Sequence, residues 1–418
     1  MACFRCFFVY ICIKLDHMKT FLNNICGRYA SEKKTILGLS MNHYSYSLAE
    51  LARELGTSIP KITRIVSDMV AEGYLVEVGK MESASGRRPS VYGLNPDAGF
   101  FVGVDVNRDF LVVAVTNFPG RTVSIIDNIP FTLESNEASV SALCSTVLEA
   151  IRKEGIDPSK VRGYGVNLTG RVNFHTGYSY SYYMGEEKPI VQLLEAGFGQ
   201  SVVVENDSRA MAYGEYMSGI AASDEENILF LNVGWGLGIG MVLGGKLFYG
   251  KSGFSGEVGH FPLLDNNLVC QCGKVGCLET GASGSALHTL VLEKLASGRS
   301  SILSAAYRRG EEISLDDILE AVKKEDVLVI ECVEQIGSVL GRAVAGLINI
   351  FNPDLVVIGG RLSVTERYLM PPLRSAVNRL SLNLVNSDTQ IKVSRLGKTA
   401  GALGASFLSK SRLLSDLS

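Results

Sequence analysis

The sequence of 418 residues lacks an excess of charge of either sign. Lysine and arginine number 40 against 43 aspartates and glutamates, which gives a formal net charge of −3 and a pI near 6.1. Because no global basic field is present, any contact with nucleic acid must be local. The chain is also too long for one ordinary domain and predicts two or three units, each able to bury a core.

A disulfide framework is also lacking. Three of the nine cysteines lie close together, whereas the others are scattered: Cys3, Cys6, Cys12, Cys26, Cys144 and Cys332. This distribution fits the reducing cytosol, so we expect a cytoplasmic protein.

The N-terminus lacks an apolar run of membrane-spanning length. The run Cys6–Ile13 is far shorter than the roughly 20 residues that a transmembrane helix needs. No small-residue cleavage site of a secretory signal follows it. We therefore interpret residues 1–30 as an N-terminal extension, favour Met18 as the true initiator, and expect no association with a membrane.

One histidine and three cysteines share a short, glycine-rich segment between residues 256 and 279. These four residues are His260, Cys270, Cys272 and Cys277. Such soft or borderline ligands on a tight loop suit tetrahedral zinc. Gly273 and Gly276 permit the positive φ values needed to wrap a chain around a metal. The alternative, three buried free cysteines and a hydrogen-bonded histidine, fits this spacing less well.

Two glutamates flank the predicted zinc ligands. Glu257 lies three residues before His260, and Glu279 lies two residues after Cys277. A histidine that binds zinc through one ring nitrogen can hydrogen-bond through the other, so His260 and both glutamates could recognise a polyol. Alternatively, one glutamate supports the zinc site and the other is solvated; the spacing leaves both interpretations open.

The whole motif is Gly-Glu-x-Gly-His, then Cys-x-Cys-Gly-x-x-Gly-Cys-x-Glu beginning ten positions after the histidine. It resembles the signature of the ROK family of bacterial sugar kinases and sugar-responsive transcriptional repressors, and the similarity extends over roughly residues 100 to 410. The resemblance implies that His260 and the three cysteines hold a structural zinc, and that Glu257, His260 and Glu279 face a sugar.

Residues 31–97 predict a winged helix-turn-helix domain that binds DNA. Ser47-Leu-Ala-Glu50 is a capping box, and after Gly56 an apolar stripe at helical spacing predicts a third helix. A β-hairpin follows, with two arginines beside its tip. The predicted DNA contacts are Ser58, Lys61, Thr63, Arg64, Arg87 and Arg88. A helical protein-interaction module is the alternative, because the net charge of this region is close to zero.

Beyond Pro96 the sequence predicts an α/β protein with an internal duplication. Three apolar strands, a helix and a further strand occur in residues 98–221, and a comparable order recurs in residues 222–398. We expect two lobes, with the zinc loop in the second and a C-terminal helix, residues 399–418, packing on the first. This order resembles the two-lobed, duplicated actin-like ATPase (ribonuclease H-like) fold of the ROK kinases.

Asn206 and Asp207 stand where ROK kinases carry a sugar contact and the catalytic base. In a kinase, Asp207 would accept the proton of the sugar hydroxyl; in a repressor the pair would bind sugar. Without the resemblance, an isolated Asn-Asp dipeptide is more typical of a helix N-cap.

Two phosphate loops are expected by the same resemblance, and both depart from the kinase pattern. The second retains Gly234, Gly236 and Gly238 but has Trp235, whose bulk would crowd a phosphate. The first follows Asp105 with Val-Asn-Arg-Asp and has no glycine, and the carboxylate of Asp109 would repel a triphosphate. These changes argue against the use of ATP and magnesium.

The sequence thus predicts a sugar-responsive repressor. Its partners would be double-stranded operator DNA and a sugar or sugar-phosphate effector, and it would act as a homodimer or dimer of dimers. The first alternative is an ATP-dependent hexose or N-acetylhexosamine kinase with Asp207 as the base. A scaffold that responds to another protein is the second.

Overall fold

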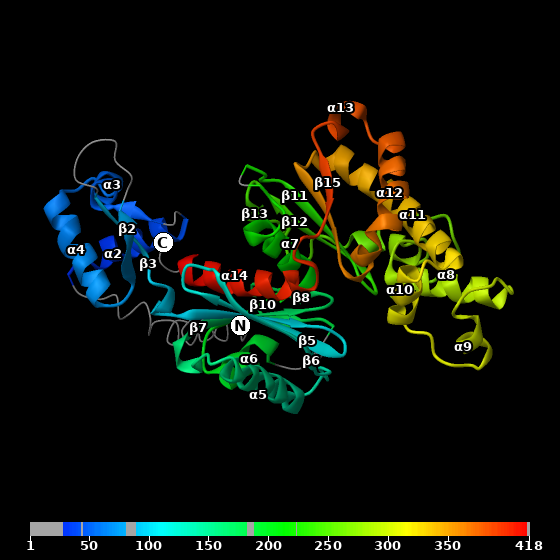
Figure 1. Cartoon of the computed structure of the whole chain (residues 1–418), viewed down its shortest axis with the longest axis horizontal. Coiled ribbons are helices and arrows are strands. Elements are labelled where there is room, and N and C mark those ends of the chain that lie inside the picture. Colours follow the sequence, from blue (N-terminus) through cyan, green and yellow to red (C-terminus); the bar gives the residue numbers. More distant parts are fainter. Residues whose placement is uncertain (1–27, 43–44, 81–88, 182–187, 223, 416–418) are drawn as a thin grey trace, which may run out of the picture. The chain divides into compact units, whose positions relative to one another are not determined.

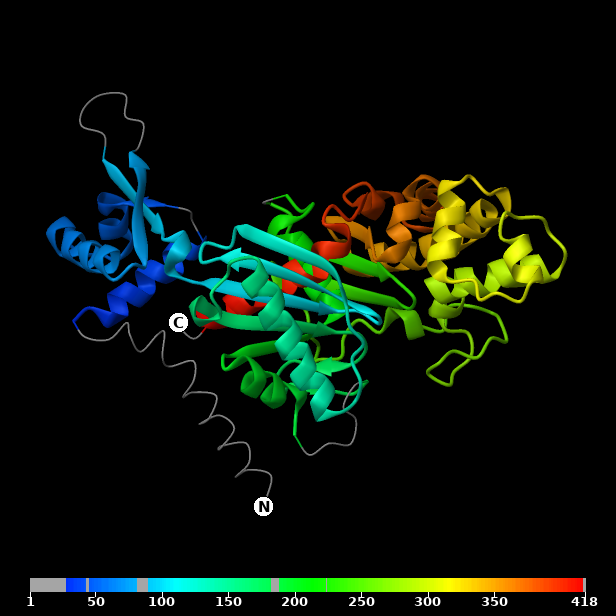
Figure 2. The same ribbon diagram turned by 60° about the horizontal axis from the view of Figure 1, so that its bottom comes forward.

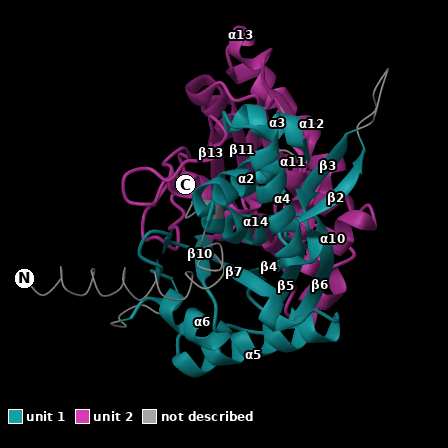
Figure 3. Ribbon diagram, turned by 90° about the vertical axis from the view of Figure 1, so that its left-hand side faces the viewer, with its two compact units in different colours: residues 1–205, 405–418 teal, residues 206–404 magenta. Residues whose placement is uncertain are grey.

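The computed structural model describes residues 28–42, 45–80, 89–181, 188–222 and 224–415 (Figure 1). Residues 1–27 of the predicted N-terminal extension lie outside these ranges, as do the predicted DNA contacts Arg87 and Arg88. The chain divides into two compact units, residues 1–205 with 405–418 and residues 206–404 (Figure 3). We call them unit 1 and unit 2.

Unit 1 begins with a winged helix-turn-helix domain. Its helices are α2 (Ala30–Asn42), α3 (Leu48–Glu54) and α4 (Ile59–Ala71), and its strands β1 (Tyr46–Ser47), β2 (Leu75–Lys80) and β3 (Ser90–Leu94) form a sheet of order β1-β3-β2. The predicted capping box starts α3, because Ser47 Oγ accepts from the Glu50 amide and Glu50 Oε2 from the Ser47 amide. Strands β2 and β3 project as a hairpin beyond the helices (Figure 2).

The winged helix domain is fastened to the rest of unit 1 by a shared core. Phe101, Phe118 and Leu413 are buried in the same apolar cluster as Ile36 and Ile62 of the helices. The connection, which includes the 3₁₀ turn η1 (Pro96–Ala98), is clamped by the guanidinium of Arg162, which donates to the Ala98 carbonyl at 2.9 and 3.1 Å. The domain therefore shares a core with the rest of unit 1 instead of being joined to it by a linker alone.

The body of unit 1 is a five-stranded sheet of order β10-β7-β4-β5-β6. Its strands are β4 (Phe100–Val106), β5 (Phe110–Asn117), β6 (Thr122–Pro130), β7 (Val161–Leu168) and β10 (Val202–Asn206). Helices α5 (Glu137–Lys153) and α6 (Ile190–Phe198) lie beside this sheet (Figure 1) and share one apolar core with it. The 3₁₀ turn η2 (Pro158–Lys160) and a small hairpin, β8 (Val172–Asn173) with β9 (Tyr178–Ser179), complete it.

The C-terminal helix α14 (Ala400–Ser415) also packs on this sheet. Gly165 of β7 permits the approach, because a Cβ there would lie 2.0 Å from the Ala405 carbonyl oxygen. The Ser406 hydroxyl is 2.7 Å from that of Thr116 and donates to the Phe101 carbonyl. These hydrogen bonds satisfy buried polar groups that would otherwise be costly.

Unit 2 repeats the same plan around a sheet of order β13-β12-β11-β14-β15. Its strands are β11 (Ile228–Val233), β12 (Leu237–Leu243), β13 (Lys246–Leu247), β14 (Leu355–Gly359) and β15 (Gln390–Val393). Its helices are α7 (Asp207–Ser218), α8 (Gly284–Ala296), α9 (Ser304–Arg308), α10 (Leu315–Lys323), α11 (Val327–Phe351), α12 (Glu366–Leu380) and α13 (Asn383–Asn386), with 3₁₀ turns η3 (Val258–His260), η4 (Leu278–Thr280), η5 (Arg361–Thr365) and η6 (Gly397–Thr399).

The two sheets correspond strand by strand. In each, an antiparallel pair, β4 with β5 or β11 with β12, is joined by a parallel strand, β7 or β14, beside its first member. This correspondence confirms the predicted α/β fold with a duplicated unit. Among the described residues, no helix is long and apolar enough to cross a bilayer.

Candidate functional site

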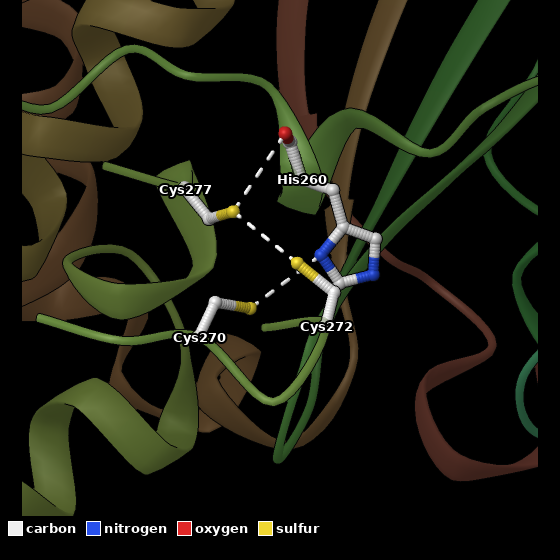
Figure 4. Close-up of side chains that lie close together, drawn as sticks. All are labelled: His260, Cys270, Cys272 and Cys277. Carbon is white, nitrogen blue, oxygen red and sulfur yellow. Dashed lines mark hydrogen bonds between the residues drawn. The ribbon is translucent and has the colours of Figure 1, made fainter. Parts of the chain in front are cut away.

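The four predicted metal ligands converge in unit 2 (Figure 4). Their ligand atoms all lie within 4.8 Å of one another. His260 Nδ1 is 3.6 Å from Cys270 Sγ, and the sulfurs of Cys272 and Cys277 are also 3.6 Å apart. Tetrahedral bonds of 2.0 to 2.3 Å place neighbouring ligand atoms about 3.5 to 3.8 Å apart, so the set fits zinc.

The segment that carries the four ligands and Glu279, residues 260–279, is called the metal loop. Its shape depends on two glycines and on backbone pairing between nearby residues. Gly273 and Gly276 have φ values of 82° and 81°, which confirms the expected left-handed conformations. The Cys270 amide donates to the Lys274 carbonyl, and Val269 pairs with Val275. Burial raises the pKa of the Cys270 and Cys277 thiols, whereas the backbone of Lys274 lowers the pKa of Cys272. Zinc would bind all three as thiolates.

The predicted polyol residues Glu257, His260 and Glu279 border this cluster. His260 directs Nδ1 to the cysteines, and its Nε2 is 3.7 Å from Glu257 Oε2. Glu279 Oε1 is 3.7 Å from Cys270 Sγ, and its Oε2 accepts from the Leu237 amide at 3.0 Å. Glu279 therefore supports the metal loop and also holds the start of β12.

Asn206 and Asp207 lie at the start of α7. Asn206 is the N-cap, and its Oδ1 accepts from the Arg209 amide. Asp207 Oδ1 accepts from the Ser208 amide at 2.7 Å and from Asn206 Nδ2 at 2.8 Å. The Nδ2 of Asn232, at the end of β11, is 3.5 Å from Asp207 Oδ2 and 3.2 Å from Ser208 Oγ. Asn232 and Ser208 were not predicted, because their meeting depends on tertiary packing.

The glycines of the second predicted phosphate loop differ in how closely other residues approach them. A Cβ at Gly238 would lie 2.3 Å from Ser208 Oγ, and one at Gly240 would lie 2.3 Å from the Ser208 carbonyl oxygen. A Cβ at Gly236 would lie 2.7 Å from Glu279 Oε2, whereas Gly234 has room. Close packing against α7 and Glu279 therefore explains Gly236 and Gly238 of the predicted loop, and Gly240 further along β12, without a phosphate.

Arg209 is a further residue that the sequence pattern did not reveal. It is buried on α7, donates from Nη1 to the Gly253 carbonyl at 3.0 Å, and lies over the ring of Tyr249. It thereby anchors the loop that leads to Glu257. A single arginine within a helix gives no sequence signal of such a long-range role.

The first predicted phosphate loop, in unit 1, is a tight turn. Asp105 is buried near the end of β4, and the Asn107 amide donates to the Phe110 carbonyl at 3.0 Å. Asn107 Nδ2 also reaches the Asp105 carbonyl at 3.5 Å. These hydrogen bonds close the turn, and the Asp109 carbonyl also accepts from the Phe131 amide at 3.2 Å.

The predicted DNA contacts that the structure describes lie on or beside α4. Ser58 is its N-cap residue, and Thr63 Oγ1 donates to the Ile59 carbonyl. Lys61 Nζ is 2.8 Å from Glu32 Oε1, and this bond lowers the pKa of Glu32. Arg64 is exposed. Lys61 is thus partly neutralised within the domain, which leaves Arg64 as the stronger candidate for a contact with DNA.

Comparison with known proteins identifies relatives of two kinds. The model of the ROK family matches residues 101–412. The xylose repressor of Caldicellulosiruptor bescii is 28% identical over 386 residues, which cover 92% of this chain and 96% of the repressor. The glucokinase of Halalkalibacterium halodurans is 30% identical over 319 residues, which cover 74% of this chain and 95% of the kinase.

A solved structure is similar along nearly the whole chain. It is a ROK family transcriptional regulator described as a homologue of the Escherichia coli MLC protein, with 26% identity and a TM-score of 0.76, and the match covers 93% of this chain and 98% of the regulator. The His260, Cys270, Cys272 and Cys277 cluster is typical of the zinc site of the matched family. The predicted zinc cofactor is thereby confirmed.

Proposed function

Because the chain belongs to the ROK family, we propose that it is a sugar-responsive transcriptional repressor. The observation that supports this most is the extent of the matches: 386 residues for the xylose repressor against 319 for the glucokinase. The family model begins at residue 101, so a match of 386 residues must also include much of the region before it, where we place the DNA-binding domain.

The winged helix domain binds operator DNA through α4. Its outer face presents Arg64 and Thr63, while Ile62, Ile65 and Met69 are buried in the domain core. A helix that presents a cation and small polar groups suits the major groove, where arginine can read guanine. Arg87 and Arg88 of the hairpin would add contacts to the phosphate backbone. In this role the protein acts as a homodimer or dimer of dimers on a two-fold symmetric site.

The effector is a sugar bound in unit 2 by Asn206, Asp207, Glu257, His260 and Glu279. Carboxylates and amides accept and donate the hydrogen bonds that a ring of hydroxyls requires. Zinc fixes the orientation of His260, so that Nε2 and Glu257 can share one ligand. The sugar regulates the protein if its affinity differs between the DNA-bound and DNA-free states.

Kinase activity is the second candidate, and Asp207 favours it as a possible base. The two phosphate loops weigh against it. Asp109 adds negative charge to a first loop without glycine, and Trp235 occupies the second. A coupled phosphorylation assay on a sugar panel, with Asp207→Asn as the inactive control, decides between the two. Turnover in the wild type that the variant loses would establish the enzyme.

The main experiment selects genomic fragments bound by the full-length protein, with and without a mixture of sugars. We expect a few two-fold symmetric sites whose recovery changes with sugar. Arg64→Ala should weaken recovery, whereas Arg367→Ala, an exposed arginine of α12 paired with Glu325, should not. If no site is enriched under either condition, the domain is an interaction module and the repressor proposal is wrong.

A further inference from the structure

The only tryptophan of the chain, Trp235, lies in the turn between β11 and β12 and is 41% exposed. Its surroundings nevertheless hold it firmly. Its carbonyl accepts from the Ser285 amide at 2.9 Å, and its indole lies against the ring of His288, with centroids 5.6 Å apart and planes tilted by 54°. His288 Nε2 is in turn 2.8 Å from the Ile313 carbonyl. One part of a large apolar ring is therefore fixed by α8 while another faces solvent.

Both ends of this turn contact a carboxylate of the proposed sugar site. At the β11 end, Asn232 Nδ2 is 3.5 Å from Asp207 Oδ2. At the β12 end, the Leu237 amide donates to Glu279 Oε2 at 3.0 Å. Trp235 is thus the exposed residue of a turn whose two ends contact anchored carboxylates, all within unit 2.

The neighbouring helix offers no backbone amide for a phosphate. The amides of Gly284 and Ser285 donate to the carbonyls of Gly234 and Trp235, at 2.8 and 2.9 Å. Those of Ala286 and Leu287 donate to the hydroxyl and carbonyl of Ser283. The first four amides of α8, which in other helices can bind anions, are therefore already satisfied.

A pyranose has a hydroxyl edge and an apolar face of C–H groups. Carboxylates suit the edge, and an indole, which combines a large apolar surface with one N–H donor, suits the face. We infer that Trp235 is a ligand-contacting residue whose indole stacks on the apolar face of a neutral, unphosphorylated sugar held by Asp207 and Glu279. This inference rests on the proposed function and narrows its effector class from sugars and sugar phosphates to neutral sugars.

The test uses the zinc-loaded, full-length protein, whose tryptophan emission comes from Trp235 alone. Glucose, xylose and N-acetylglucosamine, and the 6-phosphates of glucose and N-acetylglucosamine, are titrated by calorimetry and by fluorescence. We expect a neutral sugar to bind and to change the tryptophan emission, and we expect calorimetry and fluorescence to give the same Kd. Trp235→Ala should weaken binding about tenfold or more, Trp235→Phe should retain most of the affinity, and Tyr307→Ala, an exposed aromatic of α9, should change nothing.

The outcomes separate the inference from the proposed function. If a neutral sugar binds by calorimetry without changing the emission, and Trp235→Ala keeps wild-type affinity, the inference is wrong and the repressor proposal stands. Preferential binding of a 6-phosphate also overturns the inference alone. If no sugar binds while operator fragments are still recovered, the sugar-responsive function is wrong and the inference with it. The fluorescence titration of the wild type remains decisive should an alanine variant fold poorly.

Discussion

Two turns occupy equivalent positions in the duplicated halves, yet they differ in nearly every respect. In unit 1, Asn107–Asp109 joins β4 to β5, contains no glycine, and is closed by the Asn107 hydrogen bonds to Phe110 and Asp105. In unit 2, Gly234–Gly236 joins β11 to β12, is backed by α8, and has Asp207 and Glu279 in contact with its two ends through Asn232 and Leu237. The first turn is closed mainly by its own hydrogen bonds and is held from outside by the Phe131 amide, which donates to the Asp109 carbonyl at 3.2 Å, whereas the second is held at both ends by side chains and backed by a helix.

The difference shows how a duplicated fold can specialise. A turn that is closed by its own hydrogen bonds and held by the end of an adjacent strand offers little to a ligand. A turn whose ends contact anchored carboxylates has its geometry fixed in advance, which reduces the entropy lost when a ligand binds. The proposed ligand chemistry therefore belongs to unit 2, and we expect a structural role for the unit 1 turn.

Loss of the metal should disturb the second turn most, because the metal loop carries Glu279. In Cys272→Ser we expect loss of bound zinc and, because His260 and Glu279 lose their fixed orientation, a sugar affinity lower by roughly ten- to a hundredfold, the range by which disturbed metal-site partners reduce activity. Elemental analysis and calorimetry measure the two effects. Cys144→Ala is the matched control in unit 1, since burial raises the pKa of this thiol to about 12 and keeps it protonated. Full sugar affinity in the zinc-free variant would show that the second turn does not depend on the metal.

Unit 1 should instead respond to pH through Lys410 of α14. Burial lowers the pKa of Lys410 from 10.5 to about 8, and its ammonium donates to the Pro119 carbonyl at 2.5 Å. Between about pH 8 and 10.5 the unfolded chain binds more protons than the folded one, so stability should rise with pH, by roughly 3 kcal/mol at most. Denaturant unfolding followed by circular dichroism measures this gain.

The matched variant for this prediction is Lys410→Met, which has a similar length and no titratable group. The difference between the two proteins isolates Lys410 from the other groups that titrate in this range. Parallel stability curves for wild type and variant would show that the ammonium is better solvated than its burial indicates.

The glycines of the second turn and its following strand should not be equivalent. Gly240→Ala places a methyl group 2.3 Å from the Ser208 carbonyl oxygen and should cost roughly 1 to 3 kcal/mol of stability through displacement of α7. Gly234→Ala meets no atom closer than 3.6 Å and should change stability by less than about 0.5 kcal/mol. Thermal unfolding measures both. Equal effects would contradict the packing explanation.

The carboxylates near the two turns should differ in the same way. Asp207→Asn removes a charged acceptor and should weaken sugar binding about tenfold, which corresponds to about 1.4 kcal/mol. Asp109→Asn, the exposed acid of the first turn, should leave the Kd unchanged. Calorimetric titration measures both variants. A comparable loss in Asp109→Asn would mean that the first turn also serves the ligand.

The sequence was most informative where the structure is local. The zinc ligands lie within 18 residues of one another, and the capping box of α3 spans four residues, so spacing alone revealed them. The alternation of strands and helices likewise predicted the duplicated sheets. Residues joined by tertiary packing were missed: nothing in the pattern indicates that Asn232 meets Asp207 or that Arg209 reaches Gly253.

Two interpretations of the sequence change once the tertiary packing is known. The glycines after β11 suggested a phosphate loop, yet Gly236, Gly238 and Gly240 are explained by the close approach of Glu279 and α7. Lys61 was expected on a DNA-binding face, but Glu32, 29 residues earlier, neutralises part of its charge. In both cases the decisive neighbour comes from another element, which periodicity cannot reveal.

The clamp between Arg162 and Ala98 has a consequence for the choice of binding site. A DNA-binding domain on a flexible linker can bind half-sites at various separations. A domain that shares a core with the rest of its unit requires a defined separation. In the proposed dimer, two such domains would fix the helical phase of the DNA, which repeats every 10 to 10.5 base pairs. Inserting about five base pairs between half-sites would turn one of them to the opposite face of the duplex, where the second DNA-binding domain could not contact it.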